Sequence, residues 1–401
     1  NSACCAASGT IKCCCKAVPC SKVIGTKLIY TGGFIVSTII AYILNTSGSN
    51  ILLKMPNNTC TSTQCLLMFE YFSVLKISFA LVMYHAILAL FLLGAKNTDD
   101  PRSHLQNGFW PLKLLMWVGL VIGSFFIQDA FFEKYWIAAV VFSAVFIILQ
   151  AIILVDFACS WAEDWVGKYE MSDSNLYKYL LLGSTFGLYT FNFVVTVLLY
   201  VYYTKNEGCG VNSFFVTMNL ILMVAVSVAS VNPRIQEINS RSGLLQAAMI
   251  GAYNVYLVAS AVTEDPDGKC GSITTSSDES VATLMTYLGL LFTFLSLGYA
   301  AFSTGSSDVF HKQDTESNAD EVEIEYNFSF FHFAFVLAAF YMAAVITDWG
   351  YPTLVEGNTF VIKNNYAPVW VKICMSWLTS LLYLWTLVAP LILKDRDFGY
   401  I

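Results

Sequence analysis

The sequence predicts an all-α integral membrane protein with about ten transmembrane helices. Three observations lead to this prediction. Of the 401 residues, 57% are hydrophobic and only 12% are charged, which is about half the charged fraction of a soluble domain. The mean hydropathy is +0.62. Ten separate apolar runs each approach the length of about 20 residues that a helix needs to cross the hydrocarbon core. Lipid must therefore solvate most of the chain.

The ten runs follow one another with polar segments between them. They cover residues 28–46, 72–95, 109–127, 135–157, 179–203, 211–231, 243–262, 281–302, 328–349 and 368–393. Tryptophan and tyrosine residues lie near several run ends, as in an interfacial aromatic belt. The first run is as long as a membrane span and many others follow it, so we expect a retained helix and no cleavable signal peptide.

Lysine and arginine residues in the loops predict the orientation of the chain. A cytosolic N-terminus places fourteen basic residues on the cytosolic side and five outside, namely Lys54, Lys134, Lys205, Lys269 and Lys363. This bias agrees with the positive-inside rule, and ten spans return the C-terminus to the cytosol. The predicted organisation is a cytosolic Cys-rich N-terminus (1–27), a ten-helix transmembrane domain (28–393) with an external loop at 48–65 and an acidic cytosolic loop at 303–327, and a cytosolic tail (394–401).

The cysteines fit this orientation. Cys60, Cys65, Cys209 and Cys270 fall in predicted external loops, where disulfides can persist, although the sequence does not give their pairing. Other cysteines crowd the N-terminus beside the first span, and we expect S-acylation there in preference to unmodified thiols, at Cys13, Cys14, Cys15 and Cys20. The sequon at Asn57 lies in the external loop and is a candidate for N-glycosylation.

Motifs for enzymatic chemistry do not emerge from the sequence. The four histidines form no H-E-x-x-H pattern, and no Cys/His set has zinc spacing. The Gly183 to Gly187 segment imitates a nucleophile elbow but lies inside a helix with no strand before it. We therefore expect no enzyme activity, no metal and no cofactor. Seven acids against one lysine give residues 308–325 a charge of −6 of the total −7, so the chain offers no basic field for nucleic acid.

Polar groups inside the predicted spans are the informative residues, because each costs a few kcal/mol unless it has a partner. Asn192, Asn219 and Asn254 lie near the middle of three successive spans. They could be hydrogen-bond links between helices, or they could line a polar seam for a lipid headgroup together with Asp129 and Asp156. Lys76 fits a snorkelling lysine.

Two further patterns predict contacts between helices. Lys372 lies near the external face, where Asp348 on the preceding antiparallel helix is a candidate ion partner. Small residues four apart predict close helix packing at Gly33/Ser37, Gly119/Gly123, Gly183/Gly187 and Ala247/Gly251.

Several segments together resemble the serine incorporator (SERINC) family, and the match covers nearly the whole chain. They include Asp100-Pro101-Arg102, Asn107-Gly108-Phe109-Trp110, Asp156-Phe157-Ala158, Asn232-Pro233-Arg234, Glu264-Asp265-Pro266-Asp267, Ser329-Phe330-Phe331-His332-Phe333, Thr347-Asp348-Trp349 and Ala389-Pro390. The resemblance implies two four-helix bundles separated by long diagonal helices, and an adaptor-accessible loop that corresponds here to residues 303–327.

The resemblance also implies a function. Members of the serine incorporator family are associated with phosphatidylserine and sphingolipid synthesis, with phospholipid binding and with movement of phospholipids between leaflets. They are found in the secretory pathway and the plasma membrane. We expect ATP-independent phospholipid scrambling. The alternatives are a carrier for serine, or a scaffold in which the acidic loop recruits lipid-synthesis enzymes or trafficking adaptors. The composition of that loop favours solvated disorder. No span shows a convincing central Gly/Pro break, which argues against a carrier with broken helices.

Overall fold

The computed structural model describes residues 22–54, 60, 62–95, 100–172, 175–205, 207–238, 243–264, 270, 275–303, 327–355, 359–363 and 366–392. The predicted fold class is confirmed: these residues form twelve helices and one two-stranded sheet. Nine of the described helices are long and apolar enough to span a bilayer, and a tenth apolar helix, α5, is shorter. The chain is thus an integral multi-pass membrane protein.

The helices are α2 (Lys22–Leu53), α3 (Thr63–Phe91), α4 (Ser103–Asn107), α5 (Trp110–Phe125), α6 (Asp129–Ser172), α7 (Asn175–Tyr203), α8 (Gly210–Ser230), α9 (Pro233–Gln236), α10 (Leu244–Thr263), α11 (Thr275–Ser303), α12 (Phe328–Ile346) and α13 (Tyr366–Ile392). Strands β1 (Tyr351–Val355) and β2 (Thr359–Lys363) form an antiparallel pair between α12 and α13, in which Tyr351 is opposite Lys363. Their β-branched and aromatic residues favour extended structure.

Each of the ten predicted spans corresponds to one helix, but the lengths differ. The helix α6 has 44 residues where 23 were predicted, because the sequence after residue 157 stays free of Pro and Gly up to Gly167 and contains good helix formers. The predicted external loop 48–65 is shorter than expected, because α2 continues to Leu53 and the side chain of Ser62 caps α3 by accepting from the Cys65 amide. Similarly, α2 begins before the predicted boundary at residue 27.

The chain divides into two compact units, each with four membrane helices of its own. The first unit comprises residues 1–146 and 290–363, with α2, α3, α5 and α12; the second comprises residues 147–289 and 364–401, with α7, α8, α10 and α13. The helices α6 and α11 contribute one part to each unit.

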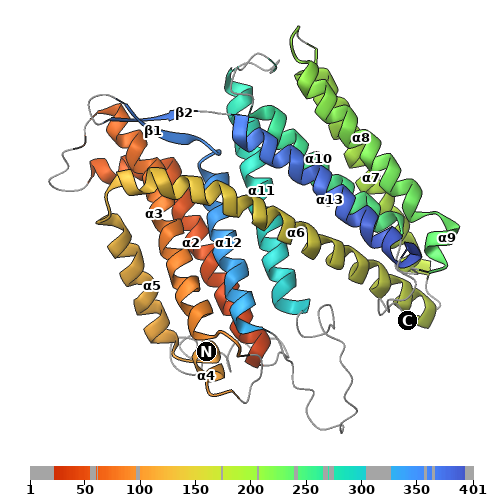
Figure 1. Cartoon of the computed structure of the whole chain (residues 1–401), viewed down its shortest axis with the longest axis horizontal. Helices are drawn as coiled ribbons and strands as arrows, with labels where there is room; N and C mark the ends of the chain where they lie inside the picture. Colours follow the sequence, from red (N-terminus) through yellow and green to blue (C-terminus); the bar gives the residue numbers. More distant parts are fainter. Residues whose placement is uncertain are drawn as a thin grey trace. The chain divides into compact units, whose positions relative to one another are not determined.

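In the first unit, α3 is the central helix and packs against α2, α5 and α12 (Figure 1). Aromatic rings fill much of the interior: Phe34 of α2 meets Phe335 of α12 edge to face at 5.7 Å, and Phe146 of α6 lies 5.1 Å from Tyr341. Such ring pairs are favourable beyond their buried area.

In the second unit, α10 is the central helix and contacts α7, α8 and α13 (Figure 1). Every residue of α10 from Leu245 to Val262 is buried. A helix that is apolar or small on all sides can be enclosed in this way. At one end, Val258, Ala259 and Val262 join a hydrophobic cluster with Phe215 of α8 and Ile373 of α13.

Candidate functional site: polar groups along a buried helix

Asn192 of α7 makes the first polar contact along α10. Its Nδ2 atom donates a hydrogen bond of 2.9 Å to the backbone oxygen of Ala248. The approach requires Gly251, because a Cβ atom at that position would lie 2.7 Å from Asn192 Nδ2. Asn192 is fully buried, yet its Oδ1 atom has no hydrogen-bond partner among the described residues.

Two further amide side chains join α10 to its neighbours about one and a half turns later. The Tyr253 hydroxyl donates to Gln150 Oε1 of α6 at 2.8 Å, and Asn254 Nδ2 donates to the Ser380 hydroxyl of α13 at the same distance. Gln150 Nε2 and Asn254 Oδ1 lack partners within the described part of the chain. An unsatisfied buried polar group costs about 1–3 kcal/mol, and a hydrogen bond to either atom would recover that cost.

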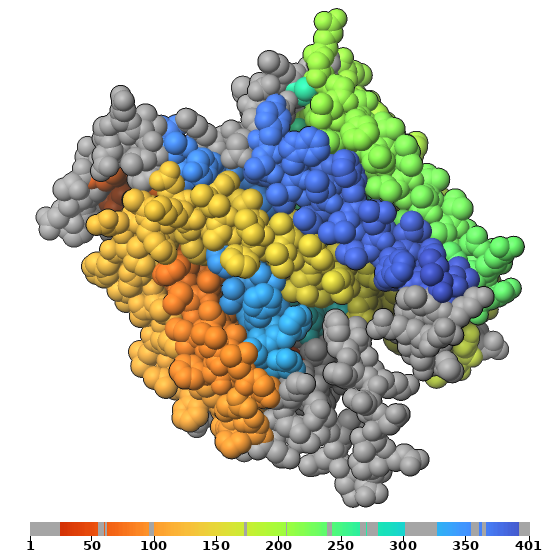
Figure 2. Space-filling model, in the orientation of Figure 1, coloured from red at the N-terminus to blue at the C-terminus, as the bar shows by residue number. Residues whose placement is uncertain are grey.

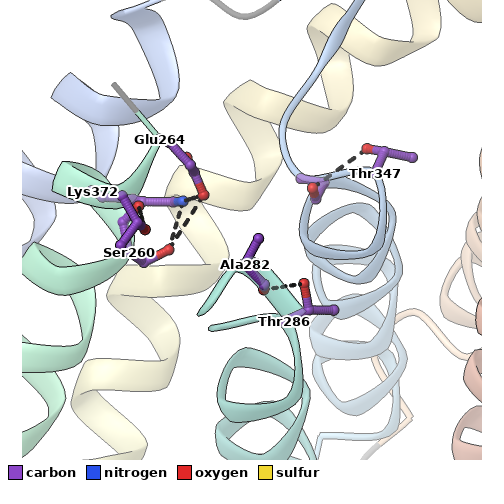
Figure 3. A network of polar contacts seen from close by, with 8 residues as sticks. Ser260, Glu264, Ala282, Thr286, Thr347 and Lys372 are labelled. Atoms are coloured by element: carbon purple, nitrogen blue, oxygen red, sulfur yellow. Dashed lines mark hydrogen bonds and ion pairs between the residues drawn. The ribbon is translucent and has the colours of Figure 1, made fainter. Parts of the chain in front are cut away.

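A buried ion pair lies at the C-terminal end of α10. The ammonium of Lys372 on α13 pairs with Glu264 and donates 2.8 Å to the hydroxyl of Ser260 (Figure 3). Ser260 and Glu264 are four residues apart and therefore lie on the same helix face. The Lys372 side chain is only 3% exposed, so the pair holds a positive charge inside the unit, near the predicted external side.

These contacts place polar side chains at successive heights along the buried helix α10. We call these heights, from Asn192 to the Lys372–Glu264 pair, the polar levels. From Ala248 to Glu264 the helix rises about 24 Å, at 1.5 Å per residue. The hydrocarbon core is about 30 Å thick. The second unit therefore carries polar side chains over most of the thickness of the membrane.

One half of α7, residues 175–191, is itself uncovered, although the neighbouring helix α10 is buried along nearly its whole length. None of the residues 175–191 is buried, and Asn192 is the first buried residue of the helix. A Cβ atom on Gly183 or Gly187 would meet nothing within 4 Å. The Thr190 hydroxyl is exposed and donates to the Phe186 carbonyl of its own helix. This half of α7 therefore presents glycines and hydroxyl groups to its surroundings, between large exposed apolar side chains such as Leu182 and Phe186.

The first unit also has a polar interior, but it is arranged between α3 and α12. Three residues of α3 spaced by seven donate or share hydrogen bonds across this contact: Tyr71 with the Gly350 carbonyl (2.8 Å), Ser78 with the Ala339 carbonyl (2.8 Å), and His85 with His332 (2.9 Å between Nδ1 atoms). Because the two imidazoles meet through one hydrogen, one ring donates and the other accepts.

Gln106 and Lys113 extend this network towards the predicted cytosolic end. His332 Nε2 lies 2.8 Å from Gln106 Oε1, and Lys113 Nζ donates 2.9 Å to the Gln106 carbonyl. The Lys113 ammonium also lies 4.3 Å from the centre of the Trp110 ring. A cation above an aromatic face is stabilised when it is desolvated. The network thus holds α4, α5 and α12 together.

Outside the membrane helices, the Asp100-Pro101-Arg102 motif forms a local ion pair. Arg102 bonds to both carboxylate oxygens of Asp100, at 2.7 and 3.0 Å, and to the Leu93 carbonyl. These hydrogen bonds lower the pKa of the Asp100 carboxyl. Through Arg102, the motif therefore links the backbone just after α3 to the residues just before α4.

The structure distributes the predicted seam residues over both units. Asn192, Asn219 and Asn254 are buried in the second unit, and Asp156 is half-buried on its part of α6. Asp129 lies in the first unit, where it pairs with Lys76 at 2.7 Å. The five residues are thus not brought together within one unit. Asp348 and Lys372 also belong to different units, so their pairing stays a prediction; the ion partner seen for Lys372 is Glu264.

The four predicted external cysteines form two disulfides, Cys60–Cys65 and Cys209–Cys270. The other predicted modification sites, Asn57 and Cys13, Cys14, Cys15 and Cys20, lie outside the described residues, as do residues 304–326 of the acidic loop and the tail 394–401. Within the described ranges, no group of three His, Cys, Asp or Glu side chains could hold a metal ion.

Several residues of these networks were missed by the sequence reasoning. Glu264 was placed beyond the end of its span, and Ser380, Gln106 and Lys113 were not singled out. A signal for Glu264 exists, because Ser260 and Glu264 share a face at the external end of α10. Lys372 enters α13 at a similar predicted depth, so matching depths could have found the pair.

Comparison with known proteins finds one family over most of the chain. The family model described as "Serine incorporator (Serinc)" matches residues 3–323 and 310–396. The chain is 34% identical to serine incorporator 3 of Bos taurus, over 93% of this chain and 92% of that protein. It is 32% identical to a probable serine incorporator of Nematostella vectensis, over 96% and 94%. It is also 35% identical to a membrane protein of Schizosaccharomyces pombe, over 93% and 90%.

Proposed function

Since the chain belongs to the serine incorporator family, we propose that it handles serine-derived phospholipids, phosphatidylserine and sphingolipids among them, by moving phospholipids between leaflets without ATP. The observation that carries this proposal is the series of polar levels along α10, from Asn192 to Lys372, inside a unit that lipid surrounds. A headgroup that crosses a bilayer loses its hydration, so polar partners at several depths lower the barrier.

The uncovered half of α7 supports the same proposal. A phospholipid can keep its acyl chains in the bilayer while its headgroup follows a helix that offers glycines and hydroxyls. Asn192 lies at the end of this half, and its unpaired Oδ1 atom can accept a hydrogen bond from an ammonium or hydroxyl group of the headgroup. The route would then continue along the side chains that contact α10.

Reconstitution in liposomes tests the proposal. The purified protein is expected to accelerate the exchange of a fluorescent phosphatidylserine between leaflets in the absence of nucleotide. A rate equal to that of protein-free vesicles rejects the proposal.

A substitution then tests the polar levels. Asn192→Leu removes the amide and should slow exchange about 5- to 10-fold, the equivalent of about 1–1.4 kcal/mol for one lost hydrogen bond. Phe193→Leu, at the adjacent position with a 63% exposed side chain, is the matched control and should keep the wild-type rate. Equal rates for both variants would remove Asn192 from the route.

One observation favours a second candidate, a carrier for serine. The Lys372 and Glu264 side chains present a cation and an anion side by side, and the carboxylate and ammonium of an amino acid could exchange with them. Uptake of radiolabelled serine into empty proteoliposomes would support this function, and its absence alongside rapid lipid exchange would exclude it. Recruitment of lipid-synthesis enzymes or adaptors through residues 303–327, and a route from the secretory pathway to the plasma membrane, are proposals that follow from the family resemblance alone.

A further inference from the structure

The helix α5 is too short for an ordinary bilayer. Its 16 residues span about 24 Å, which is about 6 Å less than the hydrocarbon core. Tilting cannot correct the difference, because a tilted helix spans a thinner layer than an upright one. The next shortest membrane helices, α12 with 19 residues and α10 with 20, are buried inside their units and so meet little lipid.

The side chains of α5 are exposed or half-buried over most of its surface. Among the contacts within its unit, α5 packs on α3, and Figure 2 shows it at the outer edge of that unit, coloured between orange and yellow. The outward side chains are large and apolar, with exposed fractions of 62%, 69% and 55% at Leu112, Leu115 and Ile122. Acyl chains must therefore cover this short helix directly.

Charged groups fix both ends of α5. In its first turn, the Lys113 ammonium is bonded to the Gln106 carbonyl at 2.9 Å. Four residues after its last residue, Asp129 begins α6 and forms the 2.7 Å ion pair with Lys76 of α3. Beyond the apolar residues Phe126 and Ile127, drawing more of the flanking chain into the hydrocarbon core would move these charges into lipid.

We propose that the bilayer beside α5 is thinned by about 6 Å, the difference between the hydrocarbon core and the helix, and that this surface selects phospholipids with short acyl chains as its neighbours. A membrane accommodates a short helix by local thinning, which is less costly than exposing apolar surface to water or burying charge. This inference concerns the bilayer and stands whether or not the protein exchanges lipids. If exchange occurs, the thinned patch shortens the path of a headgroup.

Spin-label depth measurements test the thinning. A label at Val118→Cys lies near the middle of α5, and a label at Val36→Cys lies near the middle of the longer helix α2; both positions are exposed, at 38% and 54%. Cysteines outside the two disulfides are first replaced by serine. In bilayers of 18-carbon lipids, the Val118 label should lie about 3 Å shallower than the Val36 label, half of the expected thinning. Equal depths would overturn the inference.

A length variant provides a second test. Inserting four apolar residues after Phe125 adds one turn, about 6 Å, without changing how the preceding residues pack on α3. The Val118 label should then reach the depth of the Val36 label, whereas insertion of Gly-Ser-Gly-Ser at the same place should leave it shallow. If the insertions prevent folding, the original chain in 14-carbon lipids serves instead, and there the depth difference should vanish. A difference that persists in thin bilayers would contradict local thinning.

Lipid exchange is measured on the same samples but decides a separate question. Unequal depths without exchange would retain the thinning and reject the proposed function. Exchange with equal depths would retain the proposed function and reject the thinning, so the two proposals can fail independently.

Discussion

Breaking the ion pair between Lys372 and Glu264 should destabilise the second unit strongly. The side chains are 3% and 13% exposed, so substitution of one partner removes the opposite charge from beside a buried ion. Loss of one partner of a buried pair costs about 3–5 kcal/mol. Glu264→Leu removes the anion beside the Lys372 ammonium and keeps the Ser260 hydroxyl as an acceptor, so we expect a loss near 3 kcal/mol, the lower end of that range. We expect the same loss for Lys372→Met. The double variant should lose far less than the sum, about 0–2 kcal/mol, because apolar replacement of both partners is often close to neutral.

The assay is equilibrium unfolding in mixed micelles of detergent and sodium dodecyl sulfate, followed by circular dichroism and analysed as a double-variant cycle. Asp129→Asn is the comparison, because the Lys76–Asp129 pair is more exposed, at 13% and 43%, and should contribute at most about 1 kcal/mol. Additive losses for Glu264→Leu and Lys372→Met, or a larger loss for Asp129→Asn, would refute the reasoning from burial.

Two further predictions concern the covalent and close-packed contacts. Cys209→Ser opens a loop of 61 residues and should cost about 4 kcal/mol by the chain-entropy relation, against about 2 kcal/mol for Cys60→Ser, whose loop has 5. Equilibrium unfolding of each variant against the wild type, without reductant, checks this order, and a larger loss for Cys60→Ser would contradict it. Gly251→Ala should cost about 1–3 kcal/mol through overpacking against Asn192, whereas Gly187→Ala should be neutral or slightly stabilising. Equal effects at the two glycines would show that the tight contact at Gly251 is absent.

The sequence predicts the membrane helices well because lipid imposes a simple requirement. Every backbone polar group must be bonded within its own helix, so an apolar run of sufficient length has one structure available to it. All ten runs accordingly correspond to helices. Their ends are less predictable, because polar helix formers continue a helix into water without any change in pattern, as in α6 after residue 157.

Contacts between helices depend on which faces meet, and this information is distributed over the whole chain. Of the glycine-containing pairs predicted to pack closely, only Gly251 would place a Cβ atom against another helix, whereas at Gly33, Gly119 and Gly183 a Cβ atom would meet nothing within 4 Å. A spacing of four residues marks one face of a helix but not what lies opposite. For the same reason, the sequence placed Lys372 near Asp348 by depth alone and overlooked Glu264.

The two interpretations of the central asparagines are compatible once their atoms are considered separately. The Nδ2 atoms of Asn192 and Asn254 link α10 to α7 and to α13, which is the structural role. Their Oδ1 atoms, together with Gln150 Nε2, have no partner within the described chain. A hydrogen-bond link between two helices needs one donor and one acceptor, so the links made by the Nδ2 atoms do not account for the Oδ1 atoms. Spare amide groups at mid-depth cost stability, and a headgroup or water that enters from the uncovered half of α7 would recover that cost. The proposed exchange route therefore uses these amide groups of the second unit in addition to their structural role.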